Sequence, residues 1–443
     1  MRQVGFAREI ITPPVGLPLA GYFNPRPSQG VLDDLHARAL VVEDGATAAL
    51  AVCDLIFVPP EMVERYRGRL RELGAGDWAD RAVLAATHTH TGPYTQPLFE
   101  YDADPVYQEH AARRAAEAVW RAWQSRRPAD LSVASAATND LAFNRRYWMK
   151  DGTVVTNPGK GNPDIDRPEG PVDREIAVLA ARRGGRLIGL VVNLSNHGDA
   201  IGGDLISADW HGRMEREIQR RLGEDVPVIT LIGCSGNINH FDVNSSANQC
   251  CYEESKRLGR GYGERVAAIL AAGPGREAPA GAFSMKHGTL TVVGREIAAG
   301  EIARAREVVA RPVEAAAGDL TSEGLAKGEG LVARFFAQQV LRFAEEGAGR
   351  KREFEWACWR MGDVFALATL PGEPFTEIGM ALKRASPCAV TMVSELTMGA
   401  CGYVPLPECF ERGGYETMTV MKGGCRADTA PYFIETLSQA LRD

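Results

Sequence analysis

The chain has 443 residues, of which 45% are hydrophobic and 24% are charged, and its formal net charge is −7 at pH 7. This composition is typical of a globular protein, and it excludes the basic footprint of a nucleic-acid-binding protein. No apolar run approaches the roughly 20 residues that cross a membrane, so we expect no membrane-spanning segment.

Two strands and a turn come early in the chain. Residues 38–42 and 48–53 are apolar runs that flank a Glu-Asp-Gly turn, which is a hairpin signal. A third apolar run, 82–86, leads into the segment His88-Thr89-His90, which is followed by a Gly-Pro turn. Residues 105–124 have the three-and-four spacing of a helix, with a proline in the first turn.

The middle of the chain begins with a segment of unusual composition. Residues 145–173 are rich in Gly, Pro and Asp and exceed the usual loop length, so we expect a functional lid or disorder there. Buried strands follow at 188–194, 226–232 and 364–370. Helices are expected behind the last strand and over residues 209–222, 253–272, 298–310 and 328–346.

Helices that alternate with buried strands predict an α/β fold with a mixed, largely buried β-sheet core flanked by helices. A Gly/Ala/Pro-rich stretch at 271–282 is a possible subdomain boundary. Because the candidate site residues lie on both sides of it, we expect a single catalytic unit over residues 1–443.

The cysteines and the N-terminus indicate a compartment. The nine cysteines are scattered without CxxC spacing, and the first residues lack the apolar core of a secretory signal. We therefore expect reduced, mostly buried thiols and a cytoplasmic location.

Four strand-like runs end in polar or ionisable side chains next to glycine or proline. These side chains are His88 and His90, His197, Asn237 and Asn239, and Glu373. In α/β proteins, ligands bind beyond the carboxyl ends of strands, so we expect these groups to share one crevice.

The spacing of His88 and His90 points to a metal. Residues i and i+2 of a strand share a face, and two imidazoles that converge at a strand end suit zinc. The alternative is one histidine in the core and one at the surface. A catalytic zinc often takes two histidines and a carboxylate, which His88 or His90, His197 and Glu373 would supply. The other histidine is then available for proton transfer. Carboxylates that could orient the ligands are Asp54, Asp199 and Asp209.

At these residues the chain resembles the neutral ceramidases, in their zinc-dependent catalytic domain. The resemblance runs in patches along nearly the full length, and the order and number of the patches make it specific. The patches are Ile11-Thr12-Pro13-Pro14, Asp33 to Leu40, Thr87-His88-Thr89-His90-Thr91-Gly92-Pro93, Asn144-Arg145-Arg146, Val172-Asp173-Arg174-Glu175, Asn196-His197-Gly198, Ser207-Ala208-Asp209, Gly236-Asn237-Ile238-Asn239, Leu370-Pro371-Gly372-Glu373, Cys401-Gly402-Tyr403-Val404-Pro405 and Gly413-Gly414-Tyr415-Glu416.

The resemblance implies a ceramidase catalytic-domain fold and a zinc site of His88, His197, Glu373 and Tyr403. It also implies that His90 lies beside the scissile amide. Arg145 and Tyr415 would contact the substrate or its developing oxyanion, where hydrogen-bond donors stabilise negative charge. Tyr403 enters through the resemblance alone, since a phenol in such a strand is more often a packed residue.

Two features depart from the family's pattern. Its ceramidases have a Gly-Asp-Val-Ser-Pro stretch with a catalytically important serine, and here Asn239 takes the place of that serine and His240 that of the proline. Asparagine can donate a hydrogen bond to an oxyanion, but it is no nucleophile. The full-length ceramidases also have an immunoglobulin-like domain. The 28 residues after Tyr415 are too few for a sandwich of about 100 residues, so we expect none here.

Together these residues predict a zinc-dependent hydrolase that uses water to cleave the amide (N-acyl) bond of a small soluble molecule. His90 would serve as general acid or base, while Arg145, Tyr415 and Asn239 stabilise the oxyanion. Residues 145–173 and 321–352 are candidates for shaping the pocket. The expected partner is a small-molecule amide or ester, with neither nucleic acid nor membrane, and the sequence leaves the oligomeric state open.

Two alternatives stay open. A zinc-dependent esterase or lactonase would use the same activated water, and a non-catalytic, metal-containing relative would bind a ligand in the cleft. An additional protein ligand such as His240 would favour the second alternative. Other hydrolase classes fit less well: Ser235 lacks the GxSxG spacing, no Asp-His pair follows the two histidines as in metallo-β-lactamases, and the strands lack the regular βα units of an amidohydrolase barrel.

Overall fold

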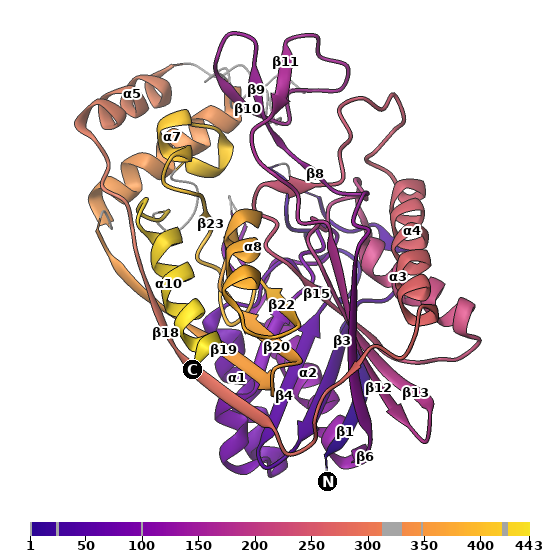
Figure 1. The fold of residues 1–443 in the computed structure, drawn as a ribbon. Helices are drawn as coiled ribbons and strands as arrows, with labels where there is room; N and C mark the ends of the chain where they lie inside the picture. The colour runs from indigo at the N-terminus through magenta and orange to yellow at the C-terminus, as the bar shows by residue number, and fades with distance from the viewer. Residues whose placement is uncertain (1, 24–25, 99–100, 312–329, 347–348, 419–423) are drawn as a thin grey trace.

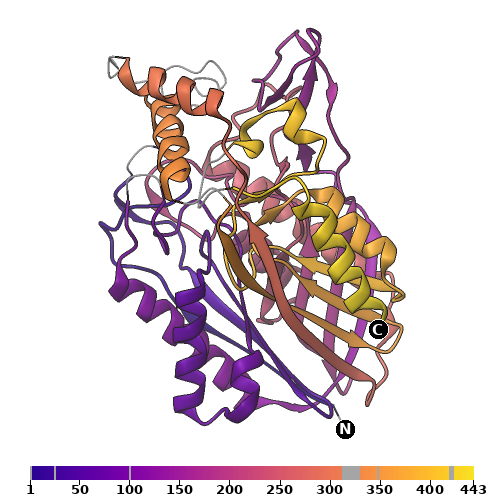
Figure 2. The same ribbon diagram turned by 90° about the vertical axis from the view of Figure 1, so that its left-hand side faces the viewer.

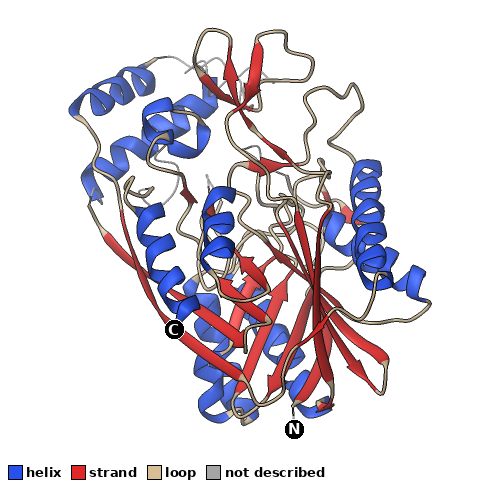
Figure 3. Cartoon of the chain, viewed as in Figure 1, coloured by secondary structure: helices blue, strands red, loops and turns tan. Residues whose placement is uncertain are grey.

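The computed structural model describes residues 2–23, 26–98, 101–311, 330–346, 349–418 and 424–443. In them the chain forms two β layers packed face to face, with helices on both outer sides (Figures 1 and 3). This arrangement confirms the expected α/β fold with a mixed, buried β-sheet core.

The first layer is a five-stranded sheet in the order β5-β4-β3-β1-β6. Its strands are β1 (Gln3–Ile10), β3 (His36–Glu43), β4 (Thr47–Cys53), β5 (Val83–Ala86) and β6 (Arg127–Pro128). The outer face is covered by α1 (Pro60–Leu73) and α2 (Pro105–Ser125), seen in purple in Figure 2. A row of buried alanines in α2 lets this helix approach the sheet closely. The expected hairpin and the expected helix are both confirmed.

The second layer consists of two sheets. One has the order β15-β13-β12-β7-β17 and comprises β7 (Asp130–Ala137), β12 (Glu175–Arg183), β13 (Arg186–Leu194), β15 (Val228–Ile232) and β17 (Arg276–Glu277). The other has the order β18-β19-β20-β22 and comprises β18 (Phe283–Val293), β19 (Lys351–Met361), β20 (Phe365–Thr369) and β22 (Val390–Ser394). The side chain of Asn193 joins the two, since its Nδ2 donates to the carbonyls of Leu231 and Val393 at 2.9 Å each.

Helices cover the outer face of this second layer. The first of its sheets packs against α3 (Asp209–Leu222) and α4 (Tyr252–Ala271), and the second against α8 (Thr376–Ala385) and α10 (Thr429–Arg442). The main hydrophobic core lies between the layers, where Leu40 and Leu50 of the first meet Leu231, Trp359 and Met392 of the second. Burying each such side chain contributes roughly 1.5–3 kcal/mol to folding.

The segment 145–173 does not form the long loop that its composition suggests. It contains β9 (Arg146–Met149), β10 (Val154–Thr156) and β11 (Ile165–Pro168), which form a small antiparallel sheet that projects at the top of Figure 1. The expectation of disorder was wrong, because most of the Gly, Pro and Asp residues lie in turns around strands of only three or four residues; a role as a lid stays a prediction.

Short strand pairs and further helices complete the described chain. The pairs are β2 (Gly30–Val31) with β14 (Leu205–Ile206), β8 (Phe143–Asn144) with β16 (Ile238–Asn239), and β21 (Glu373–Pro374) with β23 (Tyr403–Val404). The remaining helices are η1 (Gly76–Arg81), α5 (Ala299–Ala310), α7 (Gly330–Glu346), α9 (Cys409–Arg412) and η2 (Tyr415–Thr417). Of the region 321–352 proposed to shape the pocket, residues 321–329 and 347–348 lie outside the described residues.

Segment 271–282 leads from α4 to β18, and on the way β17 pairs with β7. It therefore connects the two sheets of the second layer. All nine cysteines are free, and six of them are buried, as expected of reduced thiols. Among the helices of the described residues, none has both the length and the apolar character needed to span a membrane.

A buried ion-pair cluster joins the first layer to α3. The guanidinium of Arg38 donates to Asp54 at 2.7 Å and to Glu215 at 2.8 Å, and all three side chains are buried. Removing one partner of a buried pair leaves an uncompensated charge. We expect Glu215→Gln to lower the free energy of unfolding by about 3 kcal/mol in urea titrations. The exposed Arg71–Asp80 pair is the control, and Asp80→Asn should cost less than about 1 kcal/mol.

Candidate metal centre

Three chain turns that follow buried strands meet at one point. His88 follows β5, His197 follows β13, and Glu373 lies four residues beyond the end of β20, where β21 begins. His88 Nε2 lies 3.0 Å from His197 Nε2 and 3.4 Å from Glu373 Oε2. His197 Nε2 lies 3.8 Å from the same carboxylate oxygen. The strand ends thus bring these three side chains together, as expected.

His90 belongs to the same cluster. Its Nε2 lies 3.2 Å from Nε2 of His88, and the ligand atoms of His88, His90 and His197 all lie within 4.8 Å of one another. His88 and His197 are 2% and 1% exposed, whereas His90 is partly exposed. His90 is therefore the histidine of the three that is best placed to meet a molecule entering from solvent.

The backbone fixes the orientation of His88. Its φ of 63° lies in the left-handed region, which costs a non-glycine residue free energy and is typical of functional sites. Its Nδ1 lies 3.0 Å from the carbonyl oxygen of Ile56. Since a carbonyl only accepts, Nδ1 donates to it, which leaves Nε2 as the ring nitrogen available for a metal.

The donor atoms fit a metal ion. Glu373 Oε2 and His197 Nδ1 are buried and have no hydrogen-bond partner among the described residues. A buried carboxylate oxygen without a partner is costly, and a cation at the centre of the cluster would compensate for it. Zinc–nitrogen bonds of about 2.0–2.1 Å in a tetrahedral site place ligand atoms about 3.3 Å apart, close to the separations seen here. The buried histidine group could hold a metal ion.

The charge state of the histidines suits this chemistry. Burial, and next the neighbouring His88, lower the pKa of His90 to about 3 and that of His197 well below its ordinary value. Both imidazoles are thus neutral near pH 7. Neutral imidazole is the form that binds a divalent metal.

Tyr403 and Arg145 lie beside the carboxylate of the cluster. β21 and β23 pair in parallel with Glu373 opposite Tyr403, which places the tyrosine next to the expected ligand. The Arg145 guanidinium carbon lies 5.2 Å from the centre of the Tyr403 ring. Burial, followed by the charge of Glu373, raises the pKa of the Tyr403 phenol. Loss of its proton would require the nearby positive charge of Arg145 or of a metal.

Arg145 is held by a second ion pair. Its Nε donates to Glu416 at 2.8 Å, and its Nη2 donates to the Gly236 carbonyl at 2.6 Å. Burial alone would lower the pKa of Arg145, but Tyr403 and Glu416 outweigh this effect and raise it. Arg146 and Thr156 bind the same Glu416 carboxylate, each at 2.8 Å. Arg145 therefore stays charged in a fixed position.

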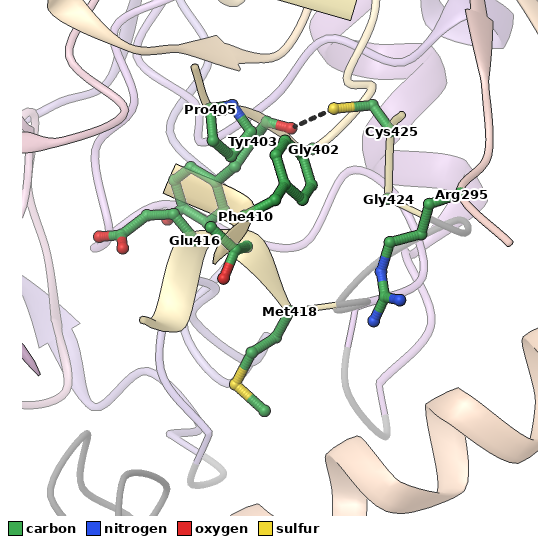
Figure 4. A pocket seen from close by; sticks show the side chains of 10 residues that line it. Arg295, Gly402, Tyr403, Pro405, Phe410, Glu416, Met418, Gly424 and Cys425 are labelled. Carbon is green, nitrogen blue, oxygen red and sulfur yellow. Dashed lines mark hydrogen bonds between the residues drawn. The ribbon is translucent and has the colours of Figure 1, made fainter. Parts of the chain in front are cut away.

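Tyr415 packs against Tyr403 with ring centres 5.6 Å apart, and against Phe336 of α7 at 6.0 Å. Figure 4 shows the neighbouring pocket, where Tyr403, Phe410 and Glu416 lie close together and Met418 points away from them. In it Cys425 Sγ donates to the backbone carbonyl of Tyr403 at 3.4 Å. Tyr415 thus packs directly against Tyr403, although it lies twelve residues further along the chain.

Asn239 is held by other polar groups. Its Nδ2 donates to Asn157 at 2.9 Å, and its Oδ1 accepts from the Phe241 amide at 3.1 Å. No hydrogen bond among the described residues joins Asn239 to the histidines. The Nδ2 group has two N–H donors and gives one of them to Asn157, and its expected contact with an oxyanion stays a prediction.

His240 is engaged on both ring nitrogens. Its Nε2 lies 2.6 Å from the Gln249 carbonyl oxygen, and its Nδ1 lies 3.2 Å from Asp199. Burial would lower the pKa of His240, but Asp199 reverses the shift and raises it. His240 is therefore a partner of Asp199 and Gln249, and neither ring nitrogen is turned toward the role of a metal ligand.

The carboxylates proposed to orient the histidines act elsewhere or indirectly. His88 is oriented by the Ile56 carbonyl, a backbone group that side-chain patterns do not report. Asp54 binds Arg38, and Asp209 accepts from the amides of Ile201 and Trp210. The Nε1 of Trp210 donates at 2.7 Å to the carbonyl of His197, so α3 still steadies that histidine.

Ser235 is not arranged as a nucleophile. Its hydroxyl and its amide both donate to the carboxylate of Glu395, and both residues are fully buried. The amide bond is 2.9 Å long. This contact fixes the turn after β15. In that turn the backbone N–H of Gly236 donates to the carbonyl of Pro374 at 3.0 Å, next to Glu373. Sequence patterns missed Glu395 because nothing distinguishes it from an ordinary acidic residue at a strand end.

His211 of α3 packs under the turn at Gly198, and its Nδ1 donates to the Ala208 carbonyl. Burial lowers its pKa to about 3, so the folded chain keeps it neutral while an unfolded chain protonates it below about pH 6.5. The stability that depends on the neutral ring is therefore lost as the pH falls through this window. In urea titrations, the stability advantage of the wild type over His211→Gln should shrink by about 2 kcal/mol between pH 7.5 and pH 5. If the stability advantage of the wild type over His211→Gln did not change with pH, His211 would not have a lowered pKa in the folded protein.

The architecture has solved counterparts. The chain is similar to neutral ceramidase from Pseudomonas aeruginosa, with 17% identity and a TM-score of 0.73, over 99% of this chain and 73% of that chain. It is likewise similar to a ceramidase complexed with C2, with 17% identity and a TM-score of 0.75, over 100% and 75% of the two chains. The chain therefore has a ceramidase-like fold, which confirms the fold expected from the sequence. No protein-family model and no curated protein matches the chain.

Proposed function

We propose that this protein is a zinc-dependent hydrolase that cleaves an amide bond of a small soluble substrate. The observation that supports this proposal best is the cluster of His88, His90, His197 and Glu373. Their donor atoms converge around a buried carboxylate oxygen that has no hydrogen-bond partner in the described part of the chain. His88, His197 and Glu373, with Tyr403 beside them, would hold the zinc. Zinc bound there supplies Lewis acidity, which polarises a substrate carbonyl and makes water more acidic near neutral pH.

The remaining groups have distinct tasks. His90 is partly exposed and neutral, and its Nε2 faces the cluster, so it can accept a proton from the attacking water and return it to the leaving amine. Arg145 is held in place by Glu416 and stays charged. Together with the phenol of Tyr415, it would stabilise negative charge on the carbonyl oxygen of the substrate.

A purely binding role is less well supported by the site. A non-catalytic relative would close the coordination sphere with an extra protein ligand, and His240, the candidate for that task, is occupied by Gln249 and Asp199. An esterase or lactonase would use the same groups, because an ester carbonyl is attacked in the same way. The two activities are separated by assay rather than by geometry.

The proposal is tested first by elemental analysis of protein purified without chelator. We expect about one zinc per chain, and removal of the zinc should abolish hydrolysis of N-acyl amines until zinc is restored. Matched esters assayed in parallel distinguish an amidase from an esterase. Protein that is free of metal and does not take up zinc would refute the proposal.

A further inference from the structure

A cavity of about 490 Å³ has Tyr22 in its wall, and Tyr22 contacts His90. Residues that line it include Tyr22, Arg26, Gln29, Gly203, Asp204 and Cys250. The ring of Tyr22 packs edge-on against the ring of His90, with centroids 5.6 Å apart. Small-molecule sites typically measure roughly 300–1,000 Å³, so the cavity is large enough for a substrate that reaches the histidines.

The charge in this cavity is unusual. Arg26 is 6% exposed, yet no carboxylate among the described residues lies within ion-pair distance of it. Its guanidinium donates to three backbone carbonyls, those of Gly203 at 2.7 Å, Ala20 at 2.5 Å and His90 at 2.6 Å. It also stacks on Tyr22 at 4.1 Å. A guanidinium has five N–H groups, so these three bonds leave part of its donor capacity unused.

Buried charges are normally neutralised, because an isolated ion in a low-dielectric interior is costly. Carbonyl dipoles compensate for Arg26 only in part. Every other buried arginine of the site has a carboxylate: Arg145 pairs with Glu416, and Arg146 with Glu169 and Glu416. Among the described residues, Arg26 thus lacks the carboxylate partner that a buried guanidinium normally has.

The acidic groups near the cavity do not cancel this charge. Asp204 is exposed, and an exposed charge is screened by water far more than a buried one. Asp199 is already paired with His240 at 3.2 Å. Arg26 is thus the one positively charged side chain among the described residues that line the cavity, beside the exposed Asp204.

We infer that this cavity binds a carboxylate of the substrate, and that Arg26 supplies the positive charge that selects it. The inference rests on the hydrolase function proposed above, and it narrows the substrate class to anionic amides such as N-acyl amino acids. The bond between Arg26 and the His90 carbonyl would couple recognition of the carboxylate to the position of the catalytic histidine.

The test compares two ligands that differ by one charge. N-benzoylglycine and N-benzoylglycinamide are titrated into the purified full-length protein by calorimetry, and hydrolysis of both is followed separately. We expect the carboxylate to bind at least about tenfold more tightly than the carboxamide, as a charge-assisted hydrogen bond provides. Equal affinities, or tighter binding of the carboxamide, would overturn the inference.

Variants at the cavity wall give effects of opposite sign without touching the Arg26 contacts to Ala20 and His90. Gln29→Glu adds a negative charge and should reduce the carboxylate preference by roughly threefold, whereas Asp204→Asn should increase it by a similar factor. A preference that both variants leave unchanged would mean that the carboxylate binds elsewhere, and would refute the assignment. Arg26→Gln also breaks three backbone contacts, so its binding data are compared only at temperatures where its melting curve shows a folded protein.

The binding and turnover data separate the two proposals. Hydrolysis of both ligands without a preference for the carboxylate would keep the hydrolase function and reject the anion site. Binding that follows the charge without hydrolysis of either ligand would keep the anion site and reject the hydrolase as proposed.

Discussion

Glu373→Gln is expected to lose zinc and activity while the protein stays folded. The substitution keeps the shape of the side chain but replaces a charged ligand with a neutral amide. Loss of an outer-sphere partner already weakens zinc binding roughly 10–100-fold, so loss of a direct ligand should weaken it more than about 100-fold. Zinc content after dialysis, and kcat/KM for an N-acyl amine, are the measurements.

A second readout separates ligation from structural support. Because Glu373 Oε2 is buried without a hydrogen-bond partner, removing its charge should leave the melting temperature of the zinc-free protein unchanged or higher. Glu377→Gln, which changes a carboxylate that binds Asn237 at 2.9 Å, is the matched control and should retain zinc. If Glu373→Gln keeps both zinc and turnover, Glu373 is not a ligand.

His90→Ala is expected to keep zinc and lose turnover. A positioned general acid or base contributes roughly 10²- to 10⁴-fold to the rate, so kcat should fall by that factor. The zinc content should stay near that of the wild type, since His88, His197 and Glu373 remain.

The close approach of His90 Nε2 to His88 Nε2, at 3.2 Å, makes this experiment discriminating. Loss of zinc from His90→Ala would identify His90 as a ligand rather than a proton carrier. Normal turnover would remove it from the mechanism altogether. His211→Gln, a change in a buried histidine beneath the His197–Gly198 turn, is the control for general disruption of the histidine region.

Much of the fold could be predicted from local patterns. The helices at 105–124 and 209–222 agree with α2 and α3 to within a residue, because their amphipathic spacing is strong and proline or glycine marks their ends. The small sheet within 145–173 could not be predicted, since its strands are short and its turn residues dominate the composition. The association of the sheets could not be predicted from the sequence either. That association depends on long-range contacts such as Asn193 to Val393.

The site could be predicted where a polar or ionisable side chain follows a buried strand. His88, His197 and Glu373 were expected together because each follows a buried strand, and the structure brings them within hydrogen-bonding or ion-pair distance. Arg26 and Glu416 gave no signal of their own. Their roles arise from what surrounds them, a cavity for one and two buried arginines for the other, and no single-sequence pattern encodes those neighbours.

The convergence of His88, His197 and Glu373 has a consequence for folding. These side chains are more than a hundred residues apart in the chain and come from the ends of three different sheets. A metal shared by them would close two very long loops, much as a covalent cross-link does, and its binding free energy would add to the stability of the native state alone. Metal supply would then set how much of this protein persists as well as how fast it works, because chains short of metal would unfold more often and be degraded sooner.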